Sequence, residues 1–222
     1  MKHKNIFALL SMIILVTPPV FAQETINQEI SEADQKVIRE RAAEKVWQFG
    51  EFIGFIADTR NNRKTRLYHC KNALNLFIEK GEWYYEEGIK RNGVRIEVSS
   101  VTSGKTYPKY LKLYLNGLAN LKYPRVYIRT TDVNMIKTTK LKRVEGEKNK
   151  FECTAFFAQE FIATTEDGKM IYGDVTYKSV KCYVFREEIE VIKPGQSPYE
   201  YIVLLGDVKA LETRPIKTNI IK

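Results

Sequence analysis

The sequence predicts an α+β domain in which two to three N-terminal helices pack on one face of a long, curved antiparallel sheet. Apolar residues recur at three- and four-residue steps, the helical period, up to about residue 81. Beyond residue 123 they follow the two-residue alternation of strands, interrupted by short turns. A sheet of this extent must bury one face, and the helices are the available cover. A cystatin-like sheet wrapped around a helix is the alternative architecture.

Three segments have helical spacing. The first is expected to begin at Ser31, which forms a capping pair with Asp34 three residues later. Its apolar face comprises Ile38, Ala42, Val46, Phe49, Ile53 and Ile56. A second helix is expected to run to about Glu79, where Lys80 and Gly81 suit a helix end. A third helix is expected over 107–118.

The remaining elements are expected to be strands. The segments 83–91 and 94–101 flank Asn92 and Gly93, a strong signal for a two-residue hairpin turn. Long strands are expected at approximately 125–144, 150–165, 169–192 and 200–212. Turn residues separate them, including Asp167 and Gly168 between the second and the third.

The start of the chain resembles a secretory signal peptide over residues 1–22. Lys2 and Lys4 precede an apolar run, 6–16, which is followed by a proline pair and by Ala22. That run is too short to span a membrane, and no later segment is apolar enough to do so. The first cysteine is Cys70, so no lipid-accepting cysteine follows the cleavage site.

We therefore expect a soluble exported protein, periplasmic or secreted, that is not a lipoprotein. The expected organisation is a signal peptide at 1–22, a flexible segment at 23–30, one α+β domain at 31–212 and a flexible tail at 213–222.

The element order resembles the cone-shaped α+β fold of the nuclear-transport-factor-like superfamily, which includes ketosteroid isomerase and scytalone dehydratase. The resemblance covers about residues 31–212 and rests on element order, without a diagnostic motif. Such folds host enzymes, ligand binders and interaction modules. Related domains commonly dimerise through the sheet, which implies a possible homodimer.

The resemblance also implies where a catalytic group would lie, because enzymes of the superfamily place an acid or a histidine between helices and sheet. By position, the acids are Asp132, Glu160 and Asp174, and the tyrosines that could line the cavity or its rim are Tyr110, Tyr114 and Tyr172. A buried acid with a raised pKa could act as a general base. Each acid could equally face water.

Cys153 and Cys182 are predicted to lie opposite each other. If the hairpin turns between Asp167 and Gly168 without interruption, paired residue numbers sum to 335, as these two do. Counting from the turn makes them a non-hydrogen-bonded pair, whose Cα separation of about 4.5 Å suits a disulfide. A bulge in one arm would put them on opposite faces, and two buried thiols are the alternative.

Positive charge gathers in one part of the chain. Between Lys105 and Lys150 there are twelve basic residues and three acids. The densest cluster is Lys137, Lys140, Lys142 and Arg143. It could bind an anionic partner or simply be a solvated sheet edge protected by lysines.

No metal, cofactor or nucleic-acid site is expected. Beyond the leader there is one histidine, His69, and the three cysteines are scattered, which gives no zinc-ligand spacing. Glycine-rich phosphate loops and nucleic-acid-binding motifs are absent.

Three functions remain open. The leading hypothesis is an exported, non-enzymatic module that binds a small apolar ligand or a partner protein. The second is an enzyme of the isomerase or dehydratase type, and an apolar pocket with a buried acid near a tyrosine would favour it. The third is an envelope-associated protein whose basic stretch binds anionic surfaces.

Overall fold

The computed structural model describes residues 30–190 and 197–216. The predicted signal peptide therefore lies outside the described residues, as does most of the segment predicted to follow it. The described residues from Ser31 onward form one compact unit.

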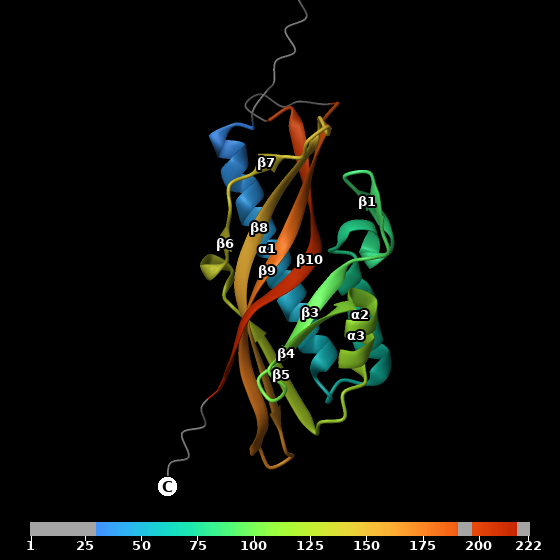
Figure 1. Cartoon of the computed structure of the whole chain (residues 1–222), viewed down its shortest axis with the longest axis vertical. Coiled ribbons are helices and arrows are strands. Elements are labelled where there is room, and N and C mark those ends of the chain that lie inside the picture. Colours follow the sequence, from blue (N-terminus) through green and yellow to red (C-terminus); the bar gives the residue numbers. More distant parts are fainter. Residues whose placement is uncertain (1–29, 191–196, 217–222) are drawn as a thin grey trace, which may run out of the picture. The chain divides into compact units, whose positions relative to one another are not determined.

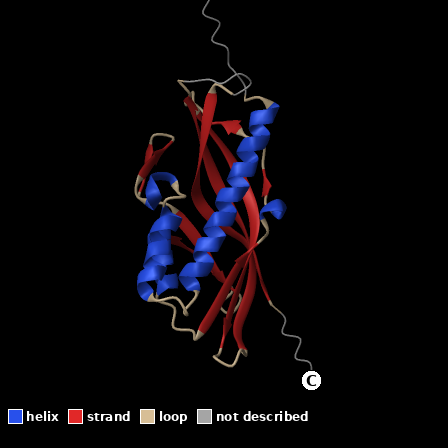
Figure 2. Cartoon of the chain, turned by 180° about the vertical axis from the view of Figure 1, so that it is seen from behind, coloured by secondary structure: helices blue, strands red, loops and turns tan. Residues whose placement is uncertain are grey.

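In the described part of the chain, three α-helices cover one face of a long sheet, which confirms the predicted α+β class (Figure 1). They are α1 (Glu32–Ala57), α2 (Arg63–Leu74) and α3 (Leu111–Ala119). Figure 2 shows α1 lying along the sheet, with the shorter α2 and α3 beside its C-terminal half. The predicted cap is present, since the Ser31 hydroxyl accepts a hydrogen bond of 3.1 Å from the Asp34 backbone N–H.

The main sheet has the strand order β4-β3-β10-β9-β8-β5. Its strands are β3 (Arg95–Ser100), β4 (Lys105–Tyr110), β5 (Arg125–Thr130), β8 (Lys150–Thr164), β9 (Met170–Glu188) and β10 (Tyr199–Pro215). Two short strands, β6 (Lys137–Thr138) and β7 (Lys142–Arg143), pair with β8 further along its edge. All pairs in this sheet are antiparallel except β10 with β3, which run parallel where Val208 faces Ile96.

The core forms where α1 packs on the sheet. The six apolar residues predicted for the inner face of this helix have exposed fractions of 1% or less. Gly50 permits the close approach of α1 to β5, because a Cβ built on it would lie 2.1 Å from the Thr130 hydroxyl oxygen. The helical period in the sequence thus identified the buried face correctly.

The second and third helices differ from the prediction in their bounds. The second ends at Leu74 because Phe77 bridges to Leu205 in β10, and a short 3-10 helix, η1 (Ile78–Gly81), follows. The third begins at Leu111 because residues 105–110 pair along the whole of β3 instead. For residues 105–110, strand pairing at the sheet edge beside β3 therefore outweighs the helical spacing of their apolar side chains.

The Asn92–Gly93 hairpin prediction is wrong. The hairpin joins β1 (Tyr84–Glu86) to β2 (Ile89–Arg91), and its turn is at Glu87 and Gly88. Gly93 has a φ of 126°, and a Cβ built on it would lie 2.8 Å from the Gly81 carbonyl oxygen. A glycine is therefore needed at this position because two backbone segments approach closely, and not because a hairpin turns here.

The strand ends also differ from the prediction. The segment expected at 125–144 is divided into β5, β6 and β7, with a 3-10 helix, η2 (Val133–Met135), after β5. Asp132 caps η2 by accepting from the Asn134 backbone N–H at 2.9 Å. The strand expected to reach residue 192 ends at Glu188, and the last strand continues past 212 to Pro215.

Candidate functional site

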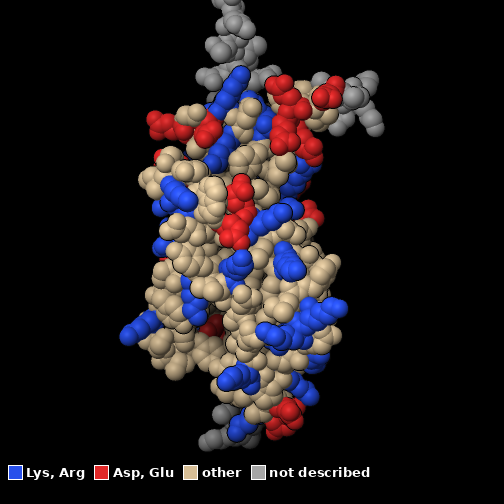
Figure 3. All heavy atoms as spheres, turned by 90° about the vertical axis from the view of Figure 1, so that its right-hand side faces the viewer, with Lys and Arg blue, Asp and Glu red and all other residues tan. Residues whose placement is uncertain are grey.

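A cavity of about 550 Å³ lies between α3, the β3–β4 hairpin and the face of β8 and β9 that also carries α1. Much of its wall is apolar or aromatic: Val98, Tyr107, Leu118, Leu121, Tyr123 and Phe161. Figure 3 views the molecule from the side on which α2, α3 and the β1–β2 hairpin lie in Figure 1. It shows a hollow in this face, with an acidic group recessed inside and basic side chains around it.

The polar groups of the cavity come from two neighbouring strands. Asp174, Thr176 and Lys178 follow one another at two-residue steps along β9. Because side chains alternate along a strand, all three lie on one face of the sheet. Gln159 on β8 lies opposite Thr176. The exposed fractions of Asp174, Lys178 and Gln159 are 5%, 6% and 5%, so the polar groups are buried beneath the apolar wall.

Two hydrogen bonds organise these groups. The Tyr172 hydroxyl donates to Oδ2 of Asp174. The Lys178 ammonium donates to Oε1 of Gln159 at 2.9 Å. Because Lys178 can only donate, this bond turns the amide oxygen of Gln159 toward it and leaves Nε2 on the other side. Within the described residues, that buried Nε2 has no hydrogen-bond partner.

Burial shifts the pKa values of the cavity groups toward their neutral forms. It raises the pKa of Asp174, although the Tyr172 hydrogen bond and the Lys178 charge act in the opposite direction. It lowers the pKa of Lys178 to about 8, against the opposing effect of Asp174. The pKa of Tyr172 is raised, first by burial and then by its hydrogen bond to Asp174.

The structure separates the acids that the sequence proposed. Asp174 lies in the cavity. Asp132 is exposed and caps η2. Glu160 lies on the face of β8 opposite to that of Gln159, where it pairs in register with Arg129.

The structure also separates the tyrosines. Tyr114 from α3 and Tyr172 from β9 line the cavity. Burial, followed by the Asp174 charge, raises the pKa of Tyr114. Tyr110 lies outside at the end of β4, where the guanidinium carbon of Arg95 is 5.5 Å from its ring centre.

Sequence reasoning missed Lys178 and Gln159. The available signal was strand parity, because Lys178 shares the parity of Asp174 in one predicted strand. The cross-strand sum of 335 would then have placed Gln159 opposite Thr176.

Cys153 and Cys182 lie directly opposite each other, as predicted. Their class of pair is not the predicted one. The Arg186 N–H donates to the Asn149 carbonyl at 2.8 Å, and hydrogen-bonded pairs alternate along the ladder, so the cysteine pair is also hydrogen-bonded. The cause is a register shift between Ala163 and Thr164, which the uninterrupted count from the turn did not include. The structure describes both cysteines as buried free thiols.

The predicted basic cluster lies along the outer edge of β8. Lys137 is in β6, Lys142 and Arg143 form β7, and these residues and Lys140 are exposed. Lys140 and Lys142 line a groove on the sheet face away from α1. Arg143 stacks on Phe151, with its guanidinium carbon 5.1 Å from the ring centre.

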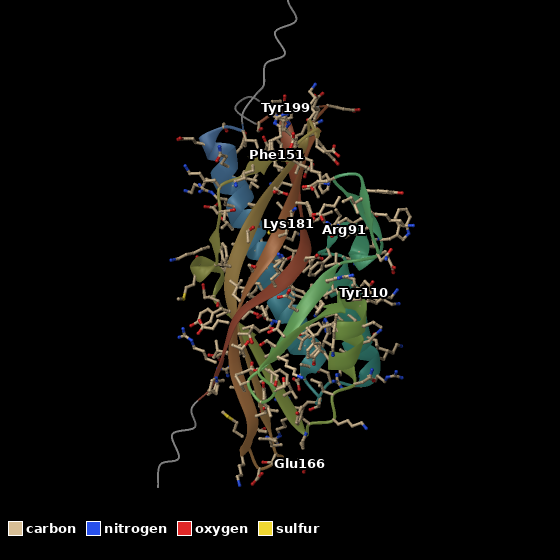
Figure 4. The ribbon with its side chains drawn as sticks, viewed as in Figure 1. Arg91, Tyr110, Phe151, Glu166, Lys181 and Tyr199 are labelled. Atoms are coloured by element: carbon tan, nitrogen blue, oxygen red, sulfur yellow. The ribbon has the colours of Figure 1, made fainter. Side chains whose placement is uncertain are left out.

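The same outer groove holds an ion-pair cluster beneath the β1–β2 hairpin. Glu86 pairs with Lys181 at 2.9 Å and with Arg91 at 2.9 Å, and it accepts a hydrogen bond from the Tyr183 hydroxyl. Lys181 also pairs with Glu152 at 2.8 Å. Figure 4 shows Arg91 on the hairpin and Lys181 on β9 close to each other. These contacts fasten the hairpin to the sheet.

None of the helices within 30–190 and 197–216 is long and apolar enough to cross a membrane. Over the same ranges, no three histidine, cysteine or acidic residues are grouped so that they could hold a metal ion.

Solved structures that are similar to this chain include two of low sequence identity. One is a scytalone dehydratase-like protein from Novosphingobium aromaticivorans, with 11% identity, a TM-score of 0.40 and coverage of 84% of this chain and 93% of that one. The other is a type 2 hexachlorocyclohexane dehydrochlorinase, LinA, with 9% identity, a TM-score of 0.33 and coverage of 81% and 93%. No family model matches the chain, and no curated protein is significantly similar to it. At these TM-scores the two likenesses say nothing about activity or ligand.

Proposed function

We propose that the chain works through this cavity, which binds a small, largely apolar molecule that carries a polar oxygen group. One observation supports the proposal most: an apolar wall surrounds buried hydrogen-bonding groups, including Nε2 of Gln159, which no described residue partners. Pockets that bind small molecules combine apolar walls with a few placed polar groups, and their volumes are roughly 300–1,000 Å³.

A cavity-filling variant tests the proposal. Gly117 on α3 lines the cavity, and a Cβ built on it would meet no atom of the described residues within 4 Å. A Gly117→Trp side chain can therefore occupy the entrance without displacing the backbone. Asn116→Trp, at the neighbouring exposed position outside the cavity lining, is the matched control.

The measurement is the shift in melting temperature with a panel of small aromatic alcohols, ketones and carboxylic acids. Compounds that stabilise the wild type should lose this effect in Gly117→Trp and keep it in Asn116→Trp, because only a bound native state gains stability. The proposal would be contradicted if the compounds stabilised Gly117→Trp as much as the wild type, or if no compound of the panel stabilised the wild type.

The second candidate is an enzyme in which Asp174 moves a proton of the bound molecule. It is favoured by the Tyr172–Asp174 hydrogen bond inside the cavity and by the pKa of Asp174, which burial raises above its ordinary value. Deuterium uptake from D₂O at the carbon next to the carbonyl of the panel's ketones is the assay. Asp174→Asn should abolish catalysed uptake while ketones still stabilise the protein; unchanged uptake would exclude this role.

Two earlier expectations remain proposals. Binding of the exposed Lys137–Arg143 cluster to an anionic surface would weaken steeply with added salt. A homodimer formed through the sheet would be detected as twice the monomer mass in solution.

A further inference from the structure

We propose that Lys178 is a nucleophile that forms an imine with a small apolar aldehyde or ketone bound in the cavity. This inference rests on the proposed function, because the cavity must admit the carbonyl compound. It adds a substrate class, carbonyl compounds, and a covalent step to that function.

The surroundings of Lys178 differ from those of an ordinary lysine in this sheet. Lys181, three residues later on the opposite face, pairs with the carboxylates of Glu86 and Glu152 at 2.9 and 2.8 Å. Lys178 has no carboxylate within 4 Å in the part of the chain that the structure describes, and its nitrogen donates to the neutral amide of Gln159. A buried lysine held by a neutral partner is free of the ion pair that would keep it charged.

Imine formation requires the neutral amine. Burial lowers the pKa of Lys178 to about 8, so on the order of a tenth of the molecules carry a neutral amine at pH 7. A lysine at the ordinary pKa would be neutral in fewer than about one molecule in a thousand. Desolvation of a lysine in an apolar pocket is a known way of activating it as a nucleophile.

The groups around Lys178 suit the oxygen of the incoming carbonyl. Nε2 of Gln159 is a buried donor without a partner among the described residues, next to the amide oxygen that holds the lysine. A carbonyl oxygen would satisfy this donor while its carbon faces the amine. Asp174 lies further along the same face of β9, and its charge acts on the pKa of Lys178.

The step conserves atoms and electrons. Nζ attacks the carbonyl carbon, a C–N bond forms, and the C=O π electrons move to the oxygen, which takes a proton while the nitrogen loses one. The resulting hydroxyl takes a second proton and leaves as water as the nitrogen loses its last proton and the C=N bond forms. Amine and carbonyl become imine and water, and nothing is oxidised or reduced. Asp174 is the acid in the cavity that can supply the proton and recover it.

Reductive trapping tests the proposal on the full chain. The protein is incubated with benzaldehyde or acetophenone and sodium cyanoborohydride, which reduces an imine to a stable secondary amine, and adducts are located by peptide mass mapping. We expect the adduct on Lys178 at about tenfold or higher occupancy than on other lysines, in keeping with its larger neutral fraction. Lys178→Met should remove this adduct, and Lys181→Met should leave it in place.

Benzyl alcohol separates failure of this inference from failure of the proposed function, because it has the same apolar body but cannot form an imine. If benzyl alcohol stabilises the protein and labelling is spread evenly over the lysines, the imine is refuted and the binding cavity stands. If neither probe stabilises the protein and Lys178 is unlabelled, both proposals fail. The peptide mass map of the wild-type protein distinguishes these outcomes even if Lys178→Met does not fold.

Discussion

Gly50 and Gly117 both lie in helices, but an added methyl group would meet different surroundings. At Gly50 it would lie 2.1 Å from the Thr130 hydroxyl oxygen and 2.4 Å from its Cβ, whereas at Gly117 no atom in the described part of the chain would lie within 4 Å of it. Gly50→Ala should therefore lower the free energy of unfolding by about 1–3 kcal/mol, the usual cost of overpacking. Gly117→Ala should raise it by about 0.5–1 kcal/mol, because alanine favours the helix. Urea unfolding measures both, and equal effects would contradict the packing of α1 on β5.

At the scale of single residues, the sequence predicted part of the candidate site. It selected Asp174, Tyr114 and Tyr172, which the cavity brings together, but also Asp132, which the structure places at an exposed turn. A residue's face follows from strand parity once the strand is known. Whether an acid meets a cavity or water depends on the element that packs over it, and that contact is not local in sequence.

The β8–β9 ladder leads to a prediction about the cysteines. Cys153 and Cys182 occupy a hydrogen-bonded pair, in which Cβ atoms lie nearer the upper end of about 4.5–5.5 Å, whereas a disulfide prefers about 3.5–4.5 Å. We therefore expect both to remain thiols, which decides between the disulfide and the two buried thiols that the sequence left open. Alkylation of the denatured, unreduced protein should modify three cysteines, the third being Cys70. If only one cysteine were modified, and the mass before reduction were about 2 Da lower, the disulfide would be present and this prediction wrong.

Elements with strong and sustained periodicity were predictable, and competing local signals were not resolved. The inner face of α1 and the register of β8 with β9 follow from the sequence to the residue over most of their length. At 105–110 the helical spacing lost to strand pairing with β3, and at Asn92–Gly93 a turn signal marked a close backbone approach. In both cases a partner distant in sequence decided the local conformation.

The whole molecule adds one arrangement that no local pattern predicts, the parallel pairing of β10 with β3. This pairing brings the β3–β4 hairpin to the mouth of the cavity, where Ser99 accepts a hydrogen bond of 2.7 Å from Thr213 of β10. The paired residues Ile96 and Val208 are more than a hundred positions apart in the sequence, so the cavity exists only in the assembled fold. The sequence could therefore indicate the class of fold, a candidate acid and, by strand parity, the lysine on the same face, but not the cavity or its volume.

Global stability should depend on pH through Lys178. Its folded pKa of about 8 lies below the ordinary 10.5, so between these values the unfolded chain binds more protons and the free energy of unfolding rises with pH. From pH 7 to pH 9.5 the gain from this residue is about 2 kcal/mol, because one pKa unit corresponds to about 1.4 kcal/mol. Lys178→Met should remove that gain, and Lys181→Met, whose ammonium is paired on the opposite face, should retain it. Urea unfolding of the three proteins across this range measures the difference. Parallel pH profiles for the wild type and Lys178→Met would show that the buried lysine keeps its ordinary pKa, and the neutral amine on which the imine depends would be lost with it.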